Sequence, residues 1–235
     1  QLEWLRQDLA NVPKDKMIIF CVHIPLRDSH NKNVQEVLAL LKEYSCFHVM
    51  SGHTHYAEND EYEDHYEHVH GAACGAWWHS TINTDGTPNG YAIYKVEGNR
   101  ITDWVYKATG ESEDFQLRLY KGSDVFFPGF SSSYSFFYNK ENDLIADIWN
   151  ADSAWKVEVY ENGALTGEMV PFGSEAKGKS RDAWATGYHC SVQGRDPKNY
   201  DRTSNSHMYH YTLKDPSSTV KVVATDRFGR KYEQD

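Results

Sequence analysis

Three histidines stand at the ends of two apolar runs and carry the side chains that a metal site needs. The motif Gly52-His53-Thr54-His55 follows one run, residues 46–50, and His23 ends the other, residues 17–22. Neutral imidazole is the commonest metal ligand among side chains. A glycine before a His-x-His motif lets the backbone turn sharply beside an ion or a substrate. We therefore predict a metal site that contains His23, His53 and His55.

The elements around these histidines are typical of a β-α-β unit. The two apolar runs predict strands over residues 17–22 and 46–50, and the first is expected to be covered on both faces. A helix is predicted from Asn33 to Tyr44, with Asn33 as its N-cap and Glu36 in the capping-box position. Strands joined in this way run parallel through a right-handed crossover. Their carboxyl ends then share one edge of the sheet, where open α/β sheets bind ligands.

The pattern of a strand ending in His-x-Pro, a helix, and a strand ending in Gly-His-Thr-His resembles the C-terminal half of a calcineurin-like (binuclear) metallophosphoesterase. The opening residues 1–5 resemble the helix that precedes the first of these strands in that family. The motifs at residues 71–78 and 85–91 resemble a bacterial subgroup in which a dedicated β-rich C-terminal domain follows the phosphoesterase domain. Residues 147–152 and 155–163 fit that second domain.

This resemblance implies a dinuclear metal centre. Two divalent or trivalent ions (zinc, manganese or iron) would clamp a phosphoryl oxygen and hold a hydroxide in line with the leaving group. Carried over, His23 and His53 share one metal and His55 binds its neighbour. Each of the three should donate its other ring nitrogen to a carbonyl or carboxylate.

Three motifs that the family carries upstream of its strand-end histidine do not occur before His23: Asp-x-His, Gly-Asp followed by a second Asp, and Gly-Asn-His followed by an acid. They supply the bridging aspartate, the asparagine ligand and the histidine that protonates the leaving group, so no catalytic residue is assigned here. We therefore interpret the chain as a fragment, inactive or nearly so on its own. Its missing N-terminal half is expected as an omitted segment or a separate chain.

The predicted fold class is α/β, a partial metallophosphoesterase sandwich over residues 1–110, followed by an all-β sandwich-like C-terminal domain over residues 111–235. A β-hairpin with its turn near Gly98 precedes the boundary. Beyond the boundary, short strands separated by turns predict an antiparallel sandwich. These strands are expected at residues 116–120, 144–149, 156–160, 183–189, 208–213 and 219–225, with turns near Asn162-Gly163 and Phe228-Gly229.

Trp77, His79 and Asp85 are the predicted substrate contacts. Trp77 and Trp78 form a candidate stacking wall for a sugar or a base, although at least one of them is expected in the core. The alternating stretch at residues 62–70 predicts an edge strand or loop with a solvated face. The remaining histidines of the second domain are expected to be packing residues: His189, His207 and His210.

The composition limits the partners of the chain. With 235 residues, a net charge of -10 and a mean hydropathy of -0.71, it lacks the basic surface that a nucleic acid requires. No apolar run approaches the roughly 20 residues of a membrane span. The four cysteines form no Cys-x-x-Cys pair, so no disulfide framework is expected. The subgroup resemblance alone implies a bacterial periplasm or cell surface.

Three functions are compatible with these observations. The first is a fragment of a metallophosphoesterase that hydrolyses phosphate esters, mono- or diesters, by a metal-bound hydroxide at a dinuclear centre. The second is a non-catalytic β-sandwich module that binds a glycan or another ligand and retains a vestigial metal motif. The third is a mononuclear zinc hydrolase in which His23, His53 and His55 leave one position open for water. No obvious general base accompanies the three histidines in that last case.

Overall fold

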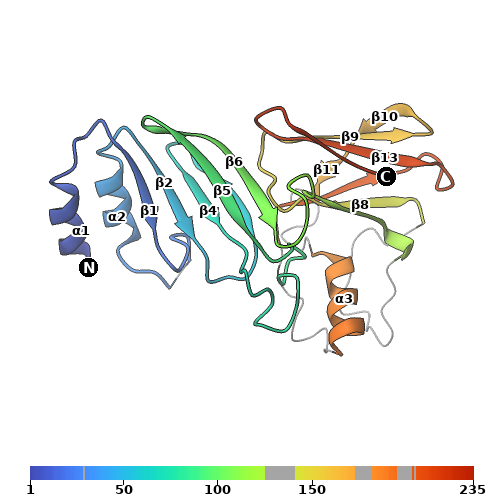
Figure 1. The fold of residues 1–235 in the computed structure, drawn as a ribbon, viewed down its shortest axis with the longest axis horizontal. Helices are drawn as coiled ribbons and strands as arrows, with labels where there is room; N and C mark the ends of the chain where they lie inside the picture. The colour runs from blue at the N-terminus through green and yellow to red at the C-terminus, as the bar shows by residue number, and fades with distance from the viewer. Residues whose placement is uncertain (29, 125–140, 173–180, 195–202, 204) are drawn as a thin grey trace.

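A computed structural model describes residues 1–28, 30–124, 141–172, 181–194, 203 and 205–235 of the chain. Its first part runs through α1 (Leu2–Leu9), β1 (Met17–Cys21), α2 (Val34–Leu41), β2 (Cys46–Ser51), β3 (Glu58–Glu61), β4 (Tyr66–Val69), β5 (Gly90–Glu97) and β6 (Arg100–Ala108). Its second part contains β7 (Arg118–Lys121), a 3-10 turn (Gly122–Asp124), β8 (Asp143–Asp147), β9 (Lys156–Glu161), β10 (Ala164–Glu168), β11 (Val170–Pro171), α3 (Ala183–Gln193), β12 (Met208–Thr212), β13 (Val220–Thr225) and β14 (Lys231–Gln234). Strands in several sheets thus dominate the described chain (Figure 1).

The sheet of the first part has the order β1-β2-β4-β3. Strands β1 and β2 pair in parallel, in a register that runs from Met17 opposite Cys46 to Cys21 opposite Met50. This confirms the parallel pairing predicted for the β-α-β unit. Strand β4 extends the sheet in parallel with β2, and β3 closes it by antiparallel pairing with β4.

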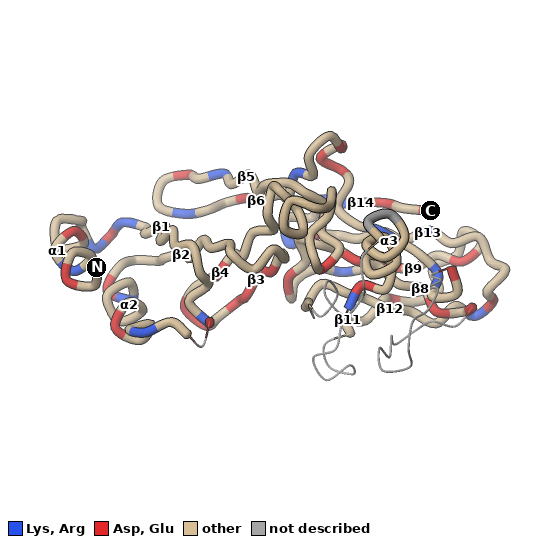
Figure 2. Tube along the Cα trace, turned by 90° about the horizontal axis from the view of Figure 1, so that it is seen from below, with Lys and Arg blue, Asp and Glu red and all other residues tan. Residues whose placement is uncertain are grey.

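The first part has three layers, with this sheet in the middle (Figure 2). Helices α1 and α2 cover one face, where Leu5 and Leu41 pack with Phe47 and Val49 of β2. Leu41 and Val49 are completely buried, and burial of such a side chain contributes about 1.5–3 kcal/mol. The β5–β6 hairpin covers the opposite face, and its turn lies at Gly98, as predicted.

Asn33 is the N-cap residue of α2, as predicted, although its φ is 62° and its side chain makes no cap hydrogen bond. Two other expectations for the first part are wrong. Strand β1 lies at the edge of the sheet rather than covered on both faces, and Ile19 is 40% exposed. The stretch 62–70 is no solvated edge, because its strand β4 lies between β2 and β3 and buries Glu67 and His68.

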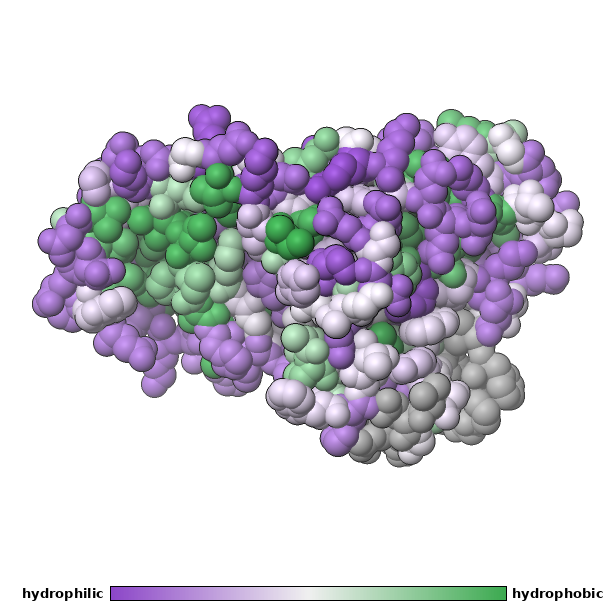
Figure 3. All heavy atoms as spheres, viewed as in Figure 1, coloured by the Kyte–Doolittle hydropathy of each residue, from purple (hydrophilic) through white to green (hydrophobic). Residues whose placement is uncertain are grey.

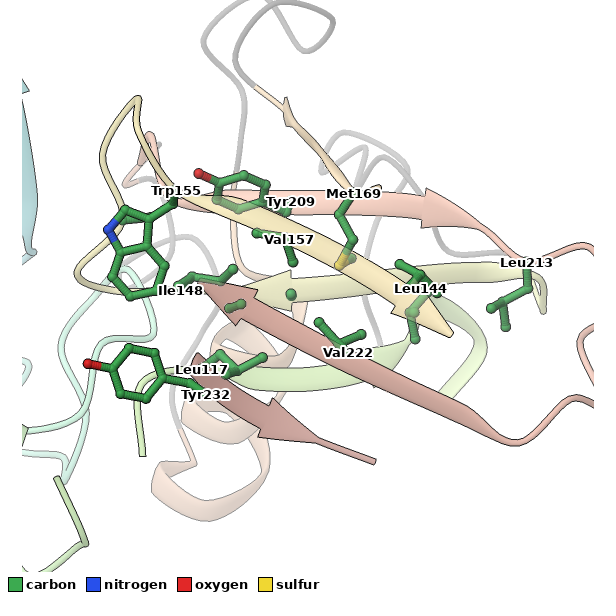
Figure 4. Packing of buried hydrophobic residues seen from close by; sticks show 14 residues of the cluster. Leu117, Leu144, Ile148, Trp155, Val157, Met169, Tyr209, Leu213, Val222 and Tyr232 are labelled. Atoms are coloured by element: carbon green, nitrogen blue, oxygen red, sulfur yellow. The ribbon is translucent and has the colours of Figure 1, made fainter. Parts of the chain in front are cut away.

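The second part is an antiparallel β-sandwich. One sheet has the order β10-β9-β13-β14 and the other β11-β12-β8-β7. Their facing side chains form one apolar core, drawn in Figure 4. The turns at Asn162-Gly163 and Phe228-Gly229 join neighbouring antiparallel strands, as predicted.

One predicted strand of the sandwich is wrong. Residues 183–189 belong to helix α3. Asp182 begins this helix as its N-cap, with its carboxylate accepting a hydrogen bond from Trp184 N at 2.9 Å. Such a cap stabilises a helix by about 1 kcal/mol. Strands β10, β11 and β14 were not among the sequence predictions.

Several surface features bear on the function. Hydrophobic side chains gather on the surface at the end of the molecule that holds α1, α2, β1 and β2 (Figure 3). Among the described residues no disulfide joins two cysteines, and the thiol of Cys21 is exposed. Among the described residues, no helix has the length and hydrophobicity needed to cross a membrane.

Candidate metal site

The His23 loop and the Gly52–His55 loop lie side by side at one edge of the sheet. Two backbone hydrogen bonds extend the β1–β2 pairing beyond the strands, from Val22 N to Met50 O at 3.0 Å and from Gly52 N to His23 O at 3.1 Å. The parallel pairing therefore brings the carboxyl ends of both strands, and the histidines after them, to the same place.

His23 and His53 meet there through their ring nitrogens. His53 Nδ1 lies 3.1 Å from His23 Nε2, and the rings meet edge to face at 4.9 Å between centroids. Both histidines are exposed. Zinc binds imidazole nitrogen at about 2.0–2.1 Å, so two such ligands of one ion have nitrogens about 3 Å apart. The pair thus fits two ligands of a single ion.

One ring nitrogen of His55 already makes a hydrogen bond to the protein backbone. Its Nδ1–H donates to the carbonyl oxygen of Gly75 at 2.7 Å, which leaves the Nε2 lone pair for a metal. Metal-binding histidines are commonly held through their second ring nitrogen in this way. Gly75 has a φ of +64°, and a Cβ there would lie 2.3 Å from Ser80 O, so only glycine fits beneath His55.

The backbone around these side chains is strained. Positive φ angles occur at His53 (71°), His55 (56°), Trp77 (53°) and Trp78 (66°). Bulky residues adopt this conformation only when their surroundings hold them there, and such residues concentrate at active sites and ligand clamps. The two strained segments touch, because the rings of His55 and Trp77 stack with centroids 4.1 Å apart.

The described residues provide only part of a metal donor set. Among the described residues, no group of three or more His, Cys, Asp or Glu side chains is arranged to hold a metal ion. The structure brings His23 and His53 together and places His55 on the same loop as His53. A complete centre therefore needs further ligands, which the described residues do not supply.

The predicted substrate contacts have different environments. Trp77 is 52% exposed and Trp78 is 84% exposed, so the expectation that at least one of them lies in the core is wrong. His79 is also exposed. Asp85 is completely buried. Its carboxylate accepts hydrogen bonds from Ala57 N and from the backbone and hydroxyl of Thr87. These hydrogen bonds give Asp85 a structural role. Substrate contact stays a prediction for Trp77, His79 and Asp85.

Glu67 was not predicted as a site residue, yet it supports the His23 loop. Its carboxylate lies in β4, 1% exposed, and Oε1 accepts a hydrogen bond from Leu26 N at 2.6 Å. The hydroxyl of Ser51 lies 3.5 Å from the same oxygen. Glu67 therefore fixes the backbone three residues after His23. The signal in the sequence was an acidic residue within an aromatic stretch, which we interpreted as a solvated face.

A pocket of about 250 Å³ opens beside Thr54, the residue between His53 and His55. Arg27 lines it and forms ion pairs with Glu58 and Asp60. Burial, together with the charge of Glu58, raises the pKa of Asp60 to about 6, although Arg27 opposes this change. The guanidinium is therefore already engaged by acidic side chains.

Other histidines of this sheet face the β5–β6 hairpin. His68 Nε2 lies 3.1 Å from His48 Nδ1, and His68 Nδ1 lies 2.9 Å from Asn59 Oδ1. Tyr94 and Trp104 of the hairpin pack against the same ring. Burial lowers the pKa of His68 to about 3. His68 is thus a neutral packing residue at physiological pH.

Comparison with known proteins found one family, and its match begins after His23, His53 and His55. The family model for the C terminal of calcineurin-like phosphoesterase matches residues 67–232. The match begins in β4, includes the β5–β6 hairpin and runs through the sandwich, so it crosses the predicted boundary at residue 110. No curated protein matches the chain. No solved structure matches it either.

Proposed function

The chain belongs to the family of C-terminal regions of calcineurin-like phosphoesterases, and from this premise we propose that it supplies part of the metal centre of a phosphate-ester hydrolase. The observation that carries the proposal is the 3.1 Å approach of His53 Nδ1 to His23 Nε2. The hydrogen bond from His55 to Gly75 supports it, because it leaves one ring nitrogen of His55 for a metal.

Each residue has a distinct role in this proposal. His23 and His53 hold one ion, and His55 holds a second. When bound, the ions supply charge stabilisation for the phosphoryl oxygens and a nucleophile at neutral pH. The exposed ring of Trp77 stacks on His55, and Trp77, Trp78 and His79 contact the alcohol portion of the ester in this proposal.

Residues outside this chain complete the centre and the sheet. Strand β1 is an unpaired edge among the described strands, and open edges readily pair with further strands. Beside it lies an apolar groove of about 470 Å³, whose lining includes Trp4, Phe20 and Val22. We propose that the N-terminal half of the enzyme, on the same or a separate polypeptide, covers this edge, and that residues 1–235 alone turn over little or no substrate.

Hydrogen exchange tests the covered edge. In the full-length protein, the β1 amides should exchange far more slowly than in residues 1–235 alone. The amides of β13, in the sandwich core, serve as the internal control and should be protected equally in both. Equal exchange of β1 in the two polypeptides would contradict the proposed covering.

Activity measurements test the centre. Full-length protein loaded with zinc or manganese should release phosphate from phenyl phosphate or a nitrophenyl diester. His53→Ala should lower metal content and reduce kcat by at least about a hundredfold, the lower end of the loss seen when one group that stabilises transition-state charge is removed. His48→Ala changes a histidine of β2, the strand before the Gly52–His55 loop, that faces the hairpin; it is the matched control and should retain both. Full metal content and activity in His53→Ala would remove the proposal.

A further inference from the structure

The β-sandwich reaches the loop at residues 83–88 through three alternate residues. Thr203 Oγ1 donates to Thr84 Oγ1 at 3.0 Å, and Asn205 Nδ2 donates to Asp85 O at 3.2 Å. His207 Nε2 lies 3.0 Å from Asp85 Oδ2. The side chains of Thr203, Asn205 and His207 therefore all contact this one loop.

The same loop holds the backbone on both sides of Tyr56. Asp85 Oδ2 accepts a hydrogen bond from Ala57 N at 2.7 Å. The carbonyl oxygen of His55 accepts two hydrogen bonds, from Thr84 N at 3.1 Å and from Thr84 Oγ1 at 2.9 Å. The position of His55 therefore depends on Thr84 and Asp85, which belong to a different loop.

His207 is itself held from the opposite side. Its Nδ1 lies 2.6 Å from Asp147 Oδ1 in β8, and the ring is 1% exposed. Both ring nitrogens face carboxylate oxygens, so both carry protons and both donate. Although burial disfavours the charged ring, Asp147 and Asp85 raise the pKa of His207 to about 10. The imidazolium is thus a fixed bridge between the sandwich and the loop.

Further buried charges surround this bridge and keep it in place. Arg118 Nη1 donates to Gly86 O at 2.9 Å and lies 3.6 Å from Asp147 Oδ2 and 3.5 Å from Asp182 Oδ2. Burial and the neighbouring Asp147 raise the pKa of Asp182 to about 8, so this carboxyl is protonated at neutral pH. The charges of Asp85 and Asp147 are then balanced by His207 and Arg118.

We propose that His207 is a positioning residue for the metal ligand His55, acting through Asp85. It touches neither metal nor substrate. By holding the Asp85 carboxylate against Ala57 N, it lets the β-sandwich determine where the His55 imidazole lies. This inference deepens the proposed function and rests on it, and it gives the sandwich a part in building the metal centre.

The test measures zinc affinity of the full-length protein by competition with a chromophoric chelator, so it needs no substrate. His207→Ala should weaken binding of the zinc held by His55 about tenfold, the lower end of the range for outer partners of metal ligands. His207→Gln retains an amide N–H that can reach Asp85 and should recover most of this loss. If His207 only stabilised the fold, His207→Ala and His207→Gln proteins that unfold at the same urea concentration would bind zinc equally tightly.

His210→Ala is the matched control. His210 lies on β12 three residues away, is also buried, and packs against Phe172 within the second domain. It should lower the urea midpoint of unfolding and leave both zinc constants unchanged. If His207→Ala does not fold, Asn205→Ala removes a neighbouring hydrogen bond to the same loop and should weaken zinc about threefold.

The results distinguish a failure of the positioning role of His207 from a failure of the proposed function. Wild-type zinc affinity in folded His207→Ala, or in Asn205→Ala where only that variant folds, overturns the positioning role and leaves the proposed function standing. An equal loss of zinc in His210→Ala also overturns it. Failure of the wild-type protein to bind zinc overturns the proposed function, and the positioning role with it.

Discussion

Removing the Glu67 side chain should release the loop that carries His23. In Glu67→Ala, the amide of Leu26 loses the carboxylate that accepts its hydrogen bond at 2.6 Å. Leu26 is 8% exposed, so water cannot readily replace that acceptor. A hydrogen bond to a charged group contributes about 1.5–3 kcal/mol, and an unsatisfied buried donor costs about 1–3 kcal/mol. We expect the free energy of unfolding to fall by about 2–4 kcal/mol.

The same variant should bind metal more weakly, because His23 follows the movement of its loop and leaves the side of His53. Loss of an outer partner of a metal ligand typically weakens binding 10–100-fold. Glu67→Gln is the matched control, since its carbonyl oxygen can still accept from Leu26 N. It should lose about 1 kcal/mol of stability and retain zinc affinity within about threefold.

Urea unfolding followed by circular dichroism measures the stability change, and chelator competition measures the zinc constant. The reasoning fails if Glu67→Ala unfolds at the wild-type urea concentration and binds zinc as tightly as the wild type. It also fails if Glu67→Gln loses as much zinc affinity as Glu67→Ala, because the hydrogen bond would then not be the cause.

Two further predictions concern stability. The contribution of neutral His68, with its pKa of about 3, to the free energy of unfolding is complete above pH 6.5 and is lost as the pH falls towards 3. The contribution of His207, with its pKa of about 10, is complete below pH 6.5 and is lost as the pH rises through 10. Each of the two histidines contributes a few kcal/mol. Urea titrations at pH 4.5, 6.5 and 9 measure both contributions, and a loss of stability between pH 6.5 and 9 that is unchanged in His207→Gln would count against the role of His207. Gly86→Ala should destabilise the fold by about 2–5 kcal/mol, because its φ is +97° and a Cβ would lie 2.2 Å from Asp182 Oδ2. Gly110→Ala, at a φ of +83° with open space around it, is the control and should lose about 1 kcal/mol; equal thermal midpoints for the two variants would contradict the packing argument.

The sequence was sufficient to predict the parts of the fold that rest on simple periodicity. Two continuous apolar runs separated by an amphipathic helix predicted the parallel pairing of β1 with β2. Regular alternation and glycine-containing turns predicted the β5–β6 hairpin and most strands of the sandwich. These patterns depend on the residues of one segment and on a shared apolar core, so no knowledge of distant contacts was needed.

Buried polar residues could not be predicted in the same way. Glu67 and His68 have the composition of a solvated strand, and they are buried because Leu26 N and Asn59 lie opposite them. The strand predicted at residues 183–189 failed for a related reason. Trp184 and Tyr188 favour strands by propensity, but the Asp182 cap and the tertiary packing of α3 determine a helix.

The candidate site shows the same division. The His-x-His spacing and the strand before it placed His53 beside His23. The link from His207 to Asp85 spans 122 positions of the sequence, and nothing in the local pattern around either residue indicates it. Contacts of this kind follow from how the sandwich docks on the loop, which only the three-dimensional structure provides.

The most direct measurement is an anomalous-scattering experiment at the zinc edge on crystals of the full-length protein grown with zinc. The account predicts one zinc within about 2.0–2.1 Å of both His23 Nε2 and His53 Nδ1, and a second zinc on His55 Nε2. Zinc bound elsewhere on the chain, or absent from the His23–His53 pair, would contradict the central claim that these two strand-end histidines share one metal ion.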